Sequence, residues 1–194
     1  MTIIATLLTE GFADWETAML NAAARGFYGV ETRFASPGGH AVTSMGGLKV
    51  QPEMTFETLD LEAIDALVIS GGLIWKTPDA PDIGQAVRQA HARGKVVAAI
   101  CDGTLALART GLLDTVAHTS NGAGYLDESG YGGAALYRDV PGAVRDQRVV
   151  TAPATAPATF MAAVLAELGR ADDQLAYYVG LYGAEHGAGV KPAA

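Results

Sequence analysis

The sequence predicts an α/β protein, a three-layer α/β/α sandwich with a mostly parallel central sheet. Short, continuous apolar runs such as Val96–Ile100 suit strands that are covered on both faces, as parallel strands are. Stretches with apolar residues at helical spacing alternate with these runs, which is typical of a doubly wound sheet. The chain has 194 residues, 49% of them hydrophobic and 18% charged, so we expect a single domain over residues 1–194.

The N-terminal half supplies the first strands and helices. Residues 3–8 are mostly apolar and predict a strand, and residues 14–25 carry an apolar helical face with Gly26 as a stop. The pair Gly46-Gly47, flanked by apolar residues, predicts the turn of a hairpin. In chain order we expect a strand at 3–8, a helix at 14–25, a strand at 30–35, a hairpin at 40–50, a strand at 66–69 and a helix at 81–93.

The C-terminal half continues the alternation. Phe160, Val164 and Leu168 stand at helical spacing, whereas residues 121–139 are rich in Gly and Tyr without a clear period. In chain order we expect a strand at 96–100, a helix from 102 to near 111, a strand at 116–119, a loop at 121–139 with at most one strand, a hairpin at 144–151, and helices at 155–168 and 172–182. The Gly/Pro/Ala-rich tail, about 187–194, is expected to be mobile.

Composition excludes several classes of function. The net charge of −8 and the pI of about 4.8 argue against nucleic acid as a partner. A single cysteine excludes an internal disulfide framework and fits a reducing compartment. The N-terminus lacks a basic region, no apolar run reaches membrane-spanning length, and no His/Cys cluster has zinc spacing. We therefore expect a cytoplasmic protein without a membrane, nucleic-acid or metal partner.

One stretch places a reactive side chain at the sheet. Cys101 directly follows Val96–Ile100, and Asp102, Gly103 and Thr104 open the next helix. The sulfur is therefore expected at the carboxyl edge of the sheet, where ligands bind in open α/β sheets. The first backbone N–H groups of the helix would favour a thiolate and hold an oxyanion. The alternative is a small buried hydrophobe, the usual state of a lone cysteine beside an apolar strand.

Glu16 is the acid expected to meet that sulfur. Residues 10–16 and Ser70-Gly71-Gly72 each follow a predicted strand, so both should converge on the edge that carries Cys101. If Glu16 points inward, burial beside a thiolate raises its pKa and lets it move a proton. If it points outward, it is a solvated acid that favours the helix macrodipole.

Three segments resemble the signature segments of the ThiJ/PfpI superfamily: residues 10–16 (EGFADWE), 66–72 (ALVISGG) and 97–103 (VAAICDG). Residues 111–121 and 149–157 are similar too, so the resemblance covers essentially the whole chain. This superfamily contains the Parkinsonism-associated deglycase, PfpI-type intracellular proteases and isocyanide hydratases. The resemblance implies a flavodoxin-like fold of the class I glutamine amidotransferase type, a homodimer, and no metal or organic cofactor.

The resemblance also implies roles for single residues. Cys101 matches the family nucleophile, Glu16 the acid that hydrogen-bonds its sulfur, and Gly72 with the backbone of Asp102 the oxyanion-hole donors. Other residues expected to bind or line a substrate site, or to approach it, are Gly71, Trp15, Asn121 and His118. For Trp15 and Tyr125, the alternatives are an apolar pocket above the sulfur and packing in the core.

The chain departs from the family where relatives place a histidine. Asp102 directly follows the cysteine, and Asn121 occupies a later family histidine position. His118 is near Asn121 in sequence, but the alternation of side chains along a strand favours the opposite face of the sheet for His118. Three roles are open for Asp102: it caps the helix or favours its dipole, it raises the thiol pKa by charge repulsion if its carboxylate lies near Cys101, or it replaces the histidine in proton transfer. Glu185-His186 has the wrong order for an amidotransferase pair, so neither glutaminase nor protease activity is expected.

These residues predict a cysteine-dependent hydrolase or lyase for a small electrophile, with glyoxalase-, deglycase- or isocyanide hydratase-like chemistry. Cys101 would attack the electrophilic carbon, backbone N–H groups of Gly72 and Asp102 would hold the developing charge, and Glu16 would move the proton. The alternative is a stress protein without turnover, whose cysteine senses oxidants reversibly or through a sulfinic acid. A third is a binding module with an inert cysteine.

Overall fold

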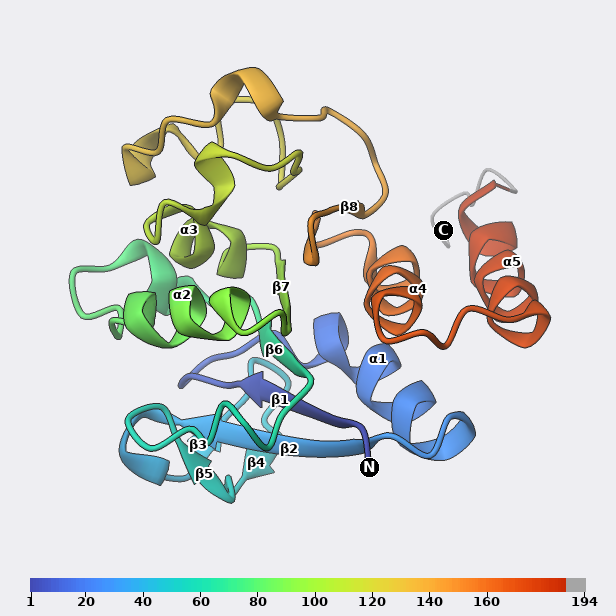
Figure 1. Ribbon diagram of the computed structural model, residues 1–194, viewed down its shortest axis with the longest axis horizontal. Coiled ribbons are helices and arrows are strands. Elements are labelled where there is room, and N and C mark those ends of the chain that lie inside the picture. Colours follow the sequence, from blue (N-terminus) through green and yellow to red (C-terminus); the bar gives the residue numbers. More distant parts are fainter. Residues whose placement is uncertain (188–194) are drawn as a thin grey trace, which may run out of the picture.

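The computed structural model describes residues 1–187 and shows one seven-stranded sheet between layers of helices (Figure 1). The strands are β1 (Ile3–Leu7), β2 (Glu31–Ser36), β5 (Met54–Thr55), β6 (Ala66–Ile69), β7 (Val96–Ile100), β8 (Val144–Asp146) and β9 (Val149–Ala152). Their order is β5-β2-β1-β6-β7-β9-β8, and only the pair β8–β9 is antiparallel. The predicted sandwich with a mostly parallel sheet is therefore confirmed.

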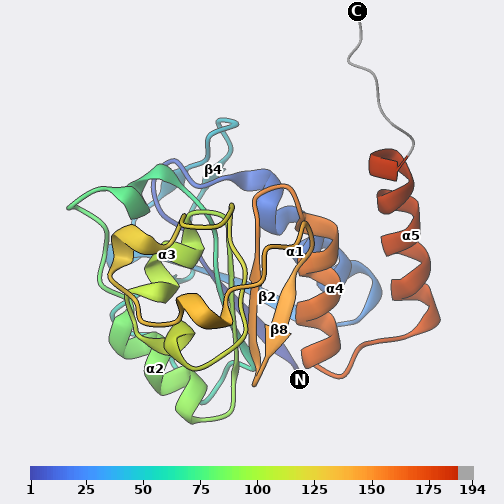
Figure 2. The same cartoon turned by 90° about the horizontal axis from the view of Figure 1, so that it is seen from above.

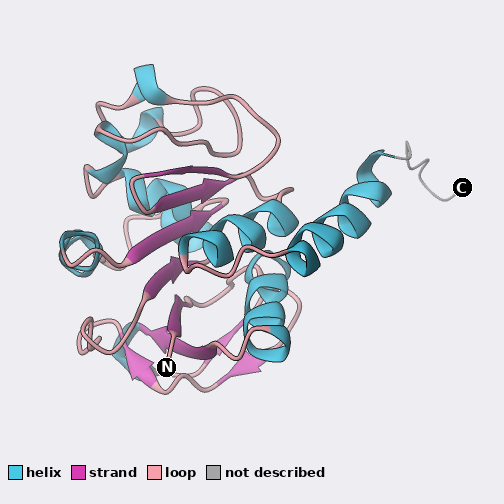
Figure 3. Ribbon diagram, turned by 45° about the vertical axis from the view of Figure 1, so that its right-hand side comes forward, coloured by secondary structure: helices cyan, strands magenta, loops and turns pink. Residues whose placement is uncertain are grey.

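Helices cover both faces of the sheet. Helices α2 (Gly84–Ala92) and α3 (Gly103–Ala108) lie on one side, and α1 (Asp14–Phe27) and α4 (Pro157–Glu167) pack together on the other (Figures 1 and 3). The last helix, α5 (Asp173–Gly187), contacts α4 and stands at the outside of the molecule (Figure 2). None of the helices in residues 1–187 is long and apolar enough to cross a bilayer.

The central strands have no solvated face. In β7, Val97 and Ala99 belong to the apolar cluster under α2 and α3, while Val96, Ala98 and Ile100 belong to the cluster under α1 and α4. All five side chains are fully buried. This two-sided burial explains the continuous apolar run, and it brings residue 101 to the carboxyl edge between the two helical layers.

Some predicted boundaries shift for local reasons. Helix α1 continues through Gly26, because the left-handed residue that terminates it is Gly29, with φ of 60°. Helix α4 begins at Pro157 rather than at 155, since proline suits the first helical turn. The short strand β5 was not predicted. The predicted tail lies outside the described residues except for Gly187, which belongs to α5.

The predicted strand at 116–119 is wrong. This segment forms only an isolated bridge between His118 and Tyr137. Two of its N–H groups bond to side chains of the neighbouring hairpin: that of Ala117 donates to Asp146 Oδ2 (2.9 Å), and that of Thr119 to Thr151 Oγ1 (2.8 Å). The segment is therefore largely buried, but it does not pair with a neighbouring strand through a ladder of backbone hydrogen bonds.

Both predicted hairpins are present. Strands β3 (Val42–Thr43) and β4 (Lys49–Val50) pair antiparallel around the glycine turn. This hairpin is fastened to the start of α1, because Ser44 Oγ donates to Asp14 Oδ2 (2.5 Å). The loop at 121–139 contains short 3-10 turns and no strand.

Candidate active site

Cys101 occupies a strained turn between β7 and α3. Its φ is 56°, in the left-handed region that residues with a side chain rarely adopt. The turn is held by the Cys101 N–H, which donates to Ala152 O (3.0 Å), and by the Cys101 carbonyl, which accepts from Thr104 N–H (3.0 Å). A Cβ on Gly103 would lie 2.7 Å from Ile69 O, so the helix can start this close to the sheet only with glycine there. The half-buried sulfur is thus presented at the sheet edge.

Glu16 points inward at this turn. Its side chain is fully buried in the first turn of α1, and Oε2 accepts the N–H of Gly71 (2.9 Å). Its other oxygen, Oε1, has no hydrogen-bond partner among the described residues. A Cβ on Gly71 would lie 2.3 Å from Glu16 Oε2 and 2.8 Å from Cys101 Cβ. Gly71 therefore separates Glu16 from Cys101 at close contact. The alternative of a solvated Glu16 is wrong.

The carboxyl and the thiol shift each other's pKa. Burial raises the pKa of Glu16 to about 7, although contact with the Cys101 thiol and the Gly71 N–H lowers it. Burial, together with the neighbouring Glu16 charge, raises the pKa of the Cys101 thiol to about 12. When Glu16 takes up the proton, that charge disappears and the carboxyl can donate to a thiolate. Near neutral pH the carboxyl therefore gains and loses a proton, while the thiol keeps its own.

The loop after β6 and the turn at Cys101 each carry a backbone N–H group that donates no hydrogen bond within residues 1–187. Gly72 forms an antiparallel bridge with Phe12 in which Ala13 N–H donates to Gly71 O (3.0 Å). In such a pair the flanking residues carry the hydrogen bonds, so the Gly72 N–H points away from Phe12. Within residues 1–187 neither this N–H nor that of Asp102 donates a hydrogen bond. Both suit the predicted oxyanion hole, whereas the Gly71 N–H is taken by Glu16.

The Asp102 carboxylate turns away from the helix it precedes. It makes no capping hydrogen bond, so the capping alternative is wrong. Its Oδ1 accepts from the Tyr125 hydroxyl and lies 3.8 Å from Lys76 Nζ, which is 4.6 Å from the centre of the Tyr125 ring. The Asp102 charge contributes to the raised pKa of Cys101, in the direction that the repulsion alternative requires.

Lys76 was missed by the sequence reasoning. It lies at the end of a 3-10 turn, Leu73–Lys76, that begins directly after Gly72. The signal was available, because a lysine only a few residues beyond the glycine turn can reach the same sheet edge as Cys101.

The structure brings Asn121 to the sulfur but not His118. Asn121 Nδ2 donates to Cys101 Sγ (3.4 Å), and its Oδ1 accepts from Ala154 N–H (2.9 Å), which fixes the amide orientation. His118 is fully buried, with Nδ1 on Val116 O (2.8 Å) and Nε2 on the Tyr131 hydroxyl (3.3 Å). Its two ring nitrogens are thus engaged elsewhere.

The two aromatic candidates differ. Trp15 is 50% exposed beside Glu16, so the alternative of core packing is wrong for it. Tyr125 is half-buried, partly packed against the core, and holds Asp102.

Comparison with known proteins finds a single family. The DJ-1/PfpI family model matches residues 2–167. Among solved structures, a DJ-1 superfamily protein of Agrobacterium tumefaciens is 46% identical with a TM-score of 0.91, over 96% of this chain and 100% of that one. A thiJ/pfpI family protein of Bacillus anthracis is 31% identical with a TM-score of 0.85, over 94% of this chain and 91% of that one.

Two curated relatives from Bacillus subtilis carry the name uncharacterized protease. YdeA is 32% identical over 82% of this chain and 79% of its own length. YoaZ is 35% identical over 66% of this chain, and the match spans only 61% of YoaZ. With the family match over most of its length, this chain belongs to the DJ-1/PfpI family.

Proposed function

We propose that the protein is a cysteine-dependent hydrolase or lyase that acts on a small electrophile such as a dicarbonyl or an isocyanide. The observation that carries the proposal is the fully buried Glu16. Its carboxyl and Cys101 both lie against Gly71, and its pKa is about 7. A carboxyl with that pKa is suited to exchange protons near neutral pH. Such a group is needed because the thiol itself is mostly protonated there.

The expected first step moves one proton and forms one bond. Cys101 Sγ attacks the electrophilic carbon while its proton passes to Glu16, and a pair of electrons of the multiple bond moves to the far atom. The N–H groups of Gly72 and Asp102 stabilise the resulting negative charge. Glu16 then returns the proton to the adduct, so the step needs no oxidant or cofactor.

A protease is less well supported, although the name occurs among relatives. Acyl transfer to water and release of an amine call for a base that also protonates the leaving group. Among residues 1–187, no histidine hydrogen-bonds Cys101, and the nearby candidate His118 is engaged by Val116 and Tyr131. Glu16 alone suits additions to small, unhindered carbons.

The redox sensor is the second candidate. It is favoured by the half-buried single sulfur and by Glu16 Oε1, which is buried without a partner and could donate, when protonated, to a sulfinate oxygen. The raised pKa of the thiol opposes it, since rapid peroxide oxidation requires a thiolate.

Turnover and oxidation can be separated with two variants. Methylglyoxal and an aryl isocyanide are the test substrates, and Cys101→Ser and Glu16→Gln are compared with the unmodified protein. The enzyme proposal expects both variants to lose activity by at least about 100-fold. Turnover that survives in Cys101→Ser contradicts it. Selective oxidation of Cys101 by dilute peroxide, without turnover of either substrate, supports the sensor.

A homodimer and a cytoplasmic location stay predictions. Light scattering of the purified chain tests the first of them.

A further inference from the structure

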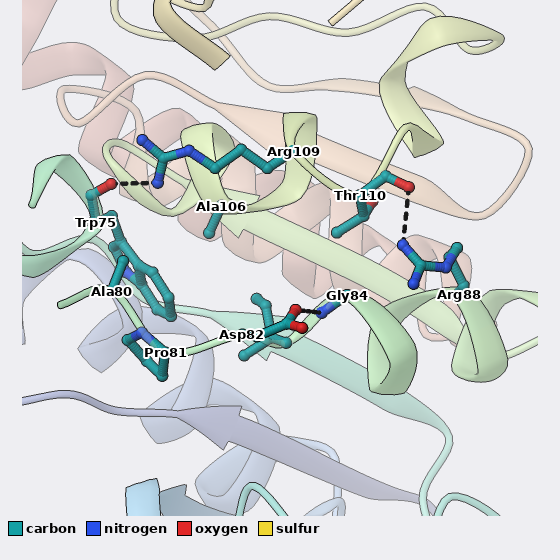
Figure 4. A pocket seen from close by; sticks show the side chains of 10 residues that line it. Trp75, Ala80, Pro81, Asp82, Gly84, Arg88, Ala106, Arg109 and Thr110 are labelled. Carbon is teal, nitrogen blue, oxygen red and sulfur yellow. Dashed lines mark hydrogen bonds between the residues drawn. The ribbon is translucent and has the colours of Figure 1, made fainter. Parts of the chain in front are cut away.

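A cavity of about 360 Å³ lies between the start of α2 and the end of α3 (Figure 4). Its volume falls in the range of small-molecule sites, about 300–1,000 Å³. Trp75, Pro81 and Ala106 give it an apolar lining, and neither Cys101 nor Glu16 belongs to it. It is therefore a separate site from the cysteine edge.

Two arginines provide positive charge on its walls. Arg88 comes from α2 and donates from Nη1 to Thr110 O (3.3 Å), and Arg109 follows α3 and donates from Nη1 to Trp75 O. Figure 4 shows the two guanidinium groups at different ends of the cavity. Neither forms an ion pair with an acid of residues 1–187. Each guanidinium has five N–H donors, so most of them are available to a ligand.

One acid limits the charge of the ligand. Asp82 lies on the wall, and its Oδ1 accepts Gly84 N–H (2.8 Å). A Cβ on Gly84 would lie 3.1 Å from Asp82 Oδ1 and 3.0 Å from Arg88 Nη1, so carboxylate and guanidinium approach the same glycine. Asp82 therefore offsets part of the charge of Arg88. Two arginines and one aspartate leave a single net positive charge, which one negative charge neutralises.

We propose that this cavity binds a small monocarboxylate with an apolar body. The planar carboxylate matches the fork of a guanidinium, most directly that of Arg109, which has no acid beside it in the cavity. The apolar body would lie against Ala80 and Pro81, which are half-buried and line the cavity. A dianion such as phosphate is disfavoured, because its second charge meets Asp82. The site is independent of the function proposed for Cys101.

Trp75 provides a direct signal for binding. It is almost completely buried and lines the cavity, and the chain has only one other tryptophan, Trp15. In a Trp15→Phe background, the emission of Trp75 is followed during titration with sodium benzoate, with neutral benzamide as the isosteric control and inorganic phosphate as the dianion. Calorimetry on the same protein measures the heat of binding.

Benzoate is expected to bind with a Kd of about 1 mM or below, and benzamide at least about tenfold more weakly. Arg109→Gln and Arg88→Gln should each weaken benzoate at least about tenfold. Arg93→Gln is the matched control and should leave the affinity unchanged. Arg93 directly follows α2, the helix that contains Arg88. It lies outside the cavity and forms an ion pair with Glu62 (2.7 Å).

Three results would overturn the proposal. The first is equal binding of benzoate and benzamide. The second is an equal benzoate affinity in the arginine variants and in Arg93→Gln. The third is the absence of both an emission change and heat up to about 10 mM benzoate. Tighter binding of phosphate would overturn the assignment to a monocarboxylate. If one arginine variant fails to fold, the benzoate affinity of the other variant and the comparison with benzamide still test the proposal.

Discussion

The two acids that flank Cys101 sit in opposite environments. Glu16 is fully buried and forms no ion pair within residues 1–187, and burial raises its pKa to about 7. Asp102 is also buried, but it faces Lys76 and the Tyr125 hydroxyl. Two carboxyl groups beside one thiol thereby differ: Glu16 can exchange a proton, and Asp102 is held by a hydroxyl and a cation. The difference comes from packing and partners, so each side can be altered separately.

The largest effect is expected from filling the Glu16 side. In Gly71→Ala the new Cβ would lie 2.3 Å from Glu16 Oε2 and 2.8 Å from Cys101 Cβ, so acid and thiol must separate. A displacement on this scale should lower turnover by about 100-fold, because the proton can no longer pass between the thiol and the acid. The strain should also lower the free energy of unfolding by about 1–3 kcal/mol.

Gly26→Ala is the control for this substitution. Gly26 lies in α1 and a Cβ there meets nothing within 4 Å, so alanine should leave the cysteine unaffected and stabilise the helix by about 0.5–1 kcal/mol. If both variants keep full reactivity, the close approach of Glu16 and Cys101 is unimportant.

The second effect concerns stability against pH. The folded pKa of Glu16, about 7, is above its ordinary value of 4.5, so the folded state binds more protons between these values. Stability from this group is therefore complete below about pH 4.5 and is lost as the pH rises through 7. In Glu16→Gln this loss should vanish, a difference of roughly 3 kcal/mol between pH 4.5 and 8. Urea unfolding of both proteins across that range measures it, and parallel curves would contradict the buried acid.

The same contrast explains what the sequence could predict. Cys101 and Glu16 were predictable because strand and helix periodicity places both at one sheet edge. Gly71 was expected to bind substrate, yet it serves as a wedge, since its N–H is taken by Glu16. That role depends on a close approach between segments far apart in the sequence, which no local pattern records.

The errors in the fold prediction have the same origin. The segment 116–119 is largely buried like a strand, but side chains of Asp146 and Thr151 accept two of its N–H groups. Periodicity reports burial, and it cannot distinguish backbone from side-chain partners. The contact of Asp102 with Tyr125 was equally hidden, because it joins the elbow to a loop without a regular pattern.

The third effect comes from the Asp102 side and should be smaller. The charge of Asp102 raises the pKa of both Cys101 and Glu16. Asp102→Asn removes this charge while keeping an oxygen that can accept from Tyr125, so the thiol should ionise more easily. We expect alkylation at pH 8 to become a few-fold faster, in line with about 1 kcal/mol for one charge that Lys76 partly compensates. A slower reaction would instead support Asp102 as the group that takes the thiol proton.

The smallest effect is expected from Lys76, and its sign is opposite. Lys76 Nζ lies 3.8 Å from Asp102 Oδ1, but the lysine side chain is 41% exposed and water screens much of its charge. Lys76→Gln leaves the Asp102 charge less compensated, so Cys101 alkylation should slow by about twofold or less at low salt. Because the effect is electrostatic, it should shrink as the salt concentration rises from about 0.01 M to 1 M. A salt-independent change would mean that Lys76 acts by positioning Tyr125. The electrostatic effect expected of Lys76 and Asp102 on Cys101 would then be wrong.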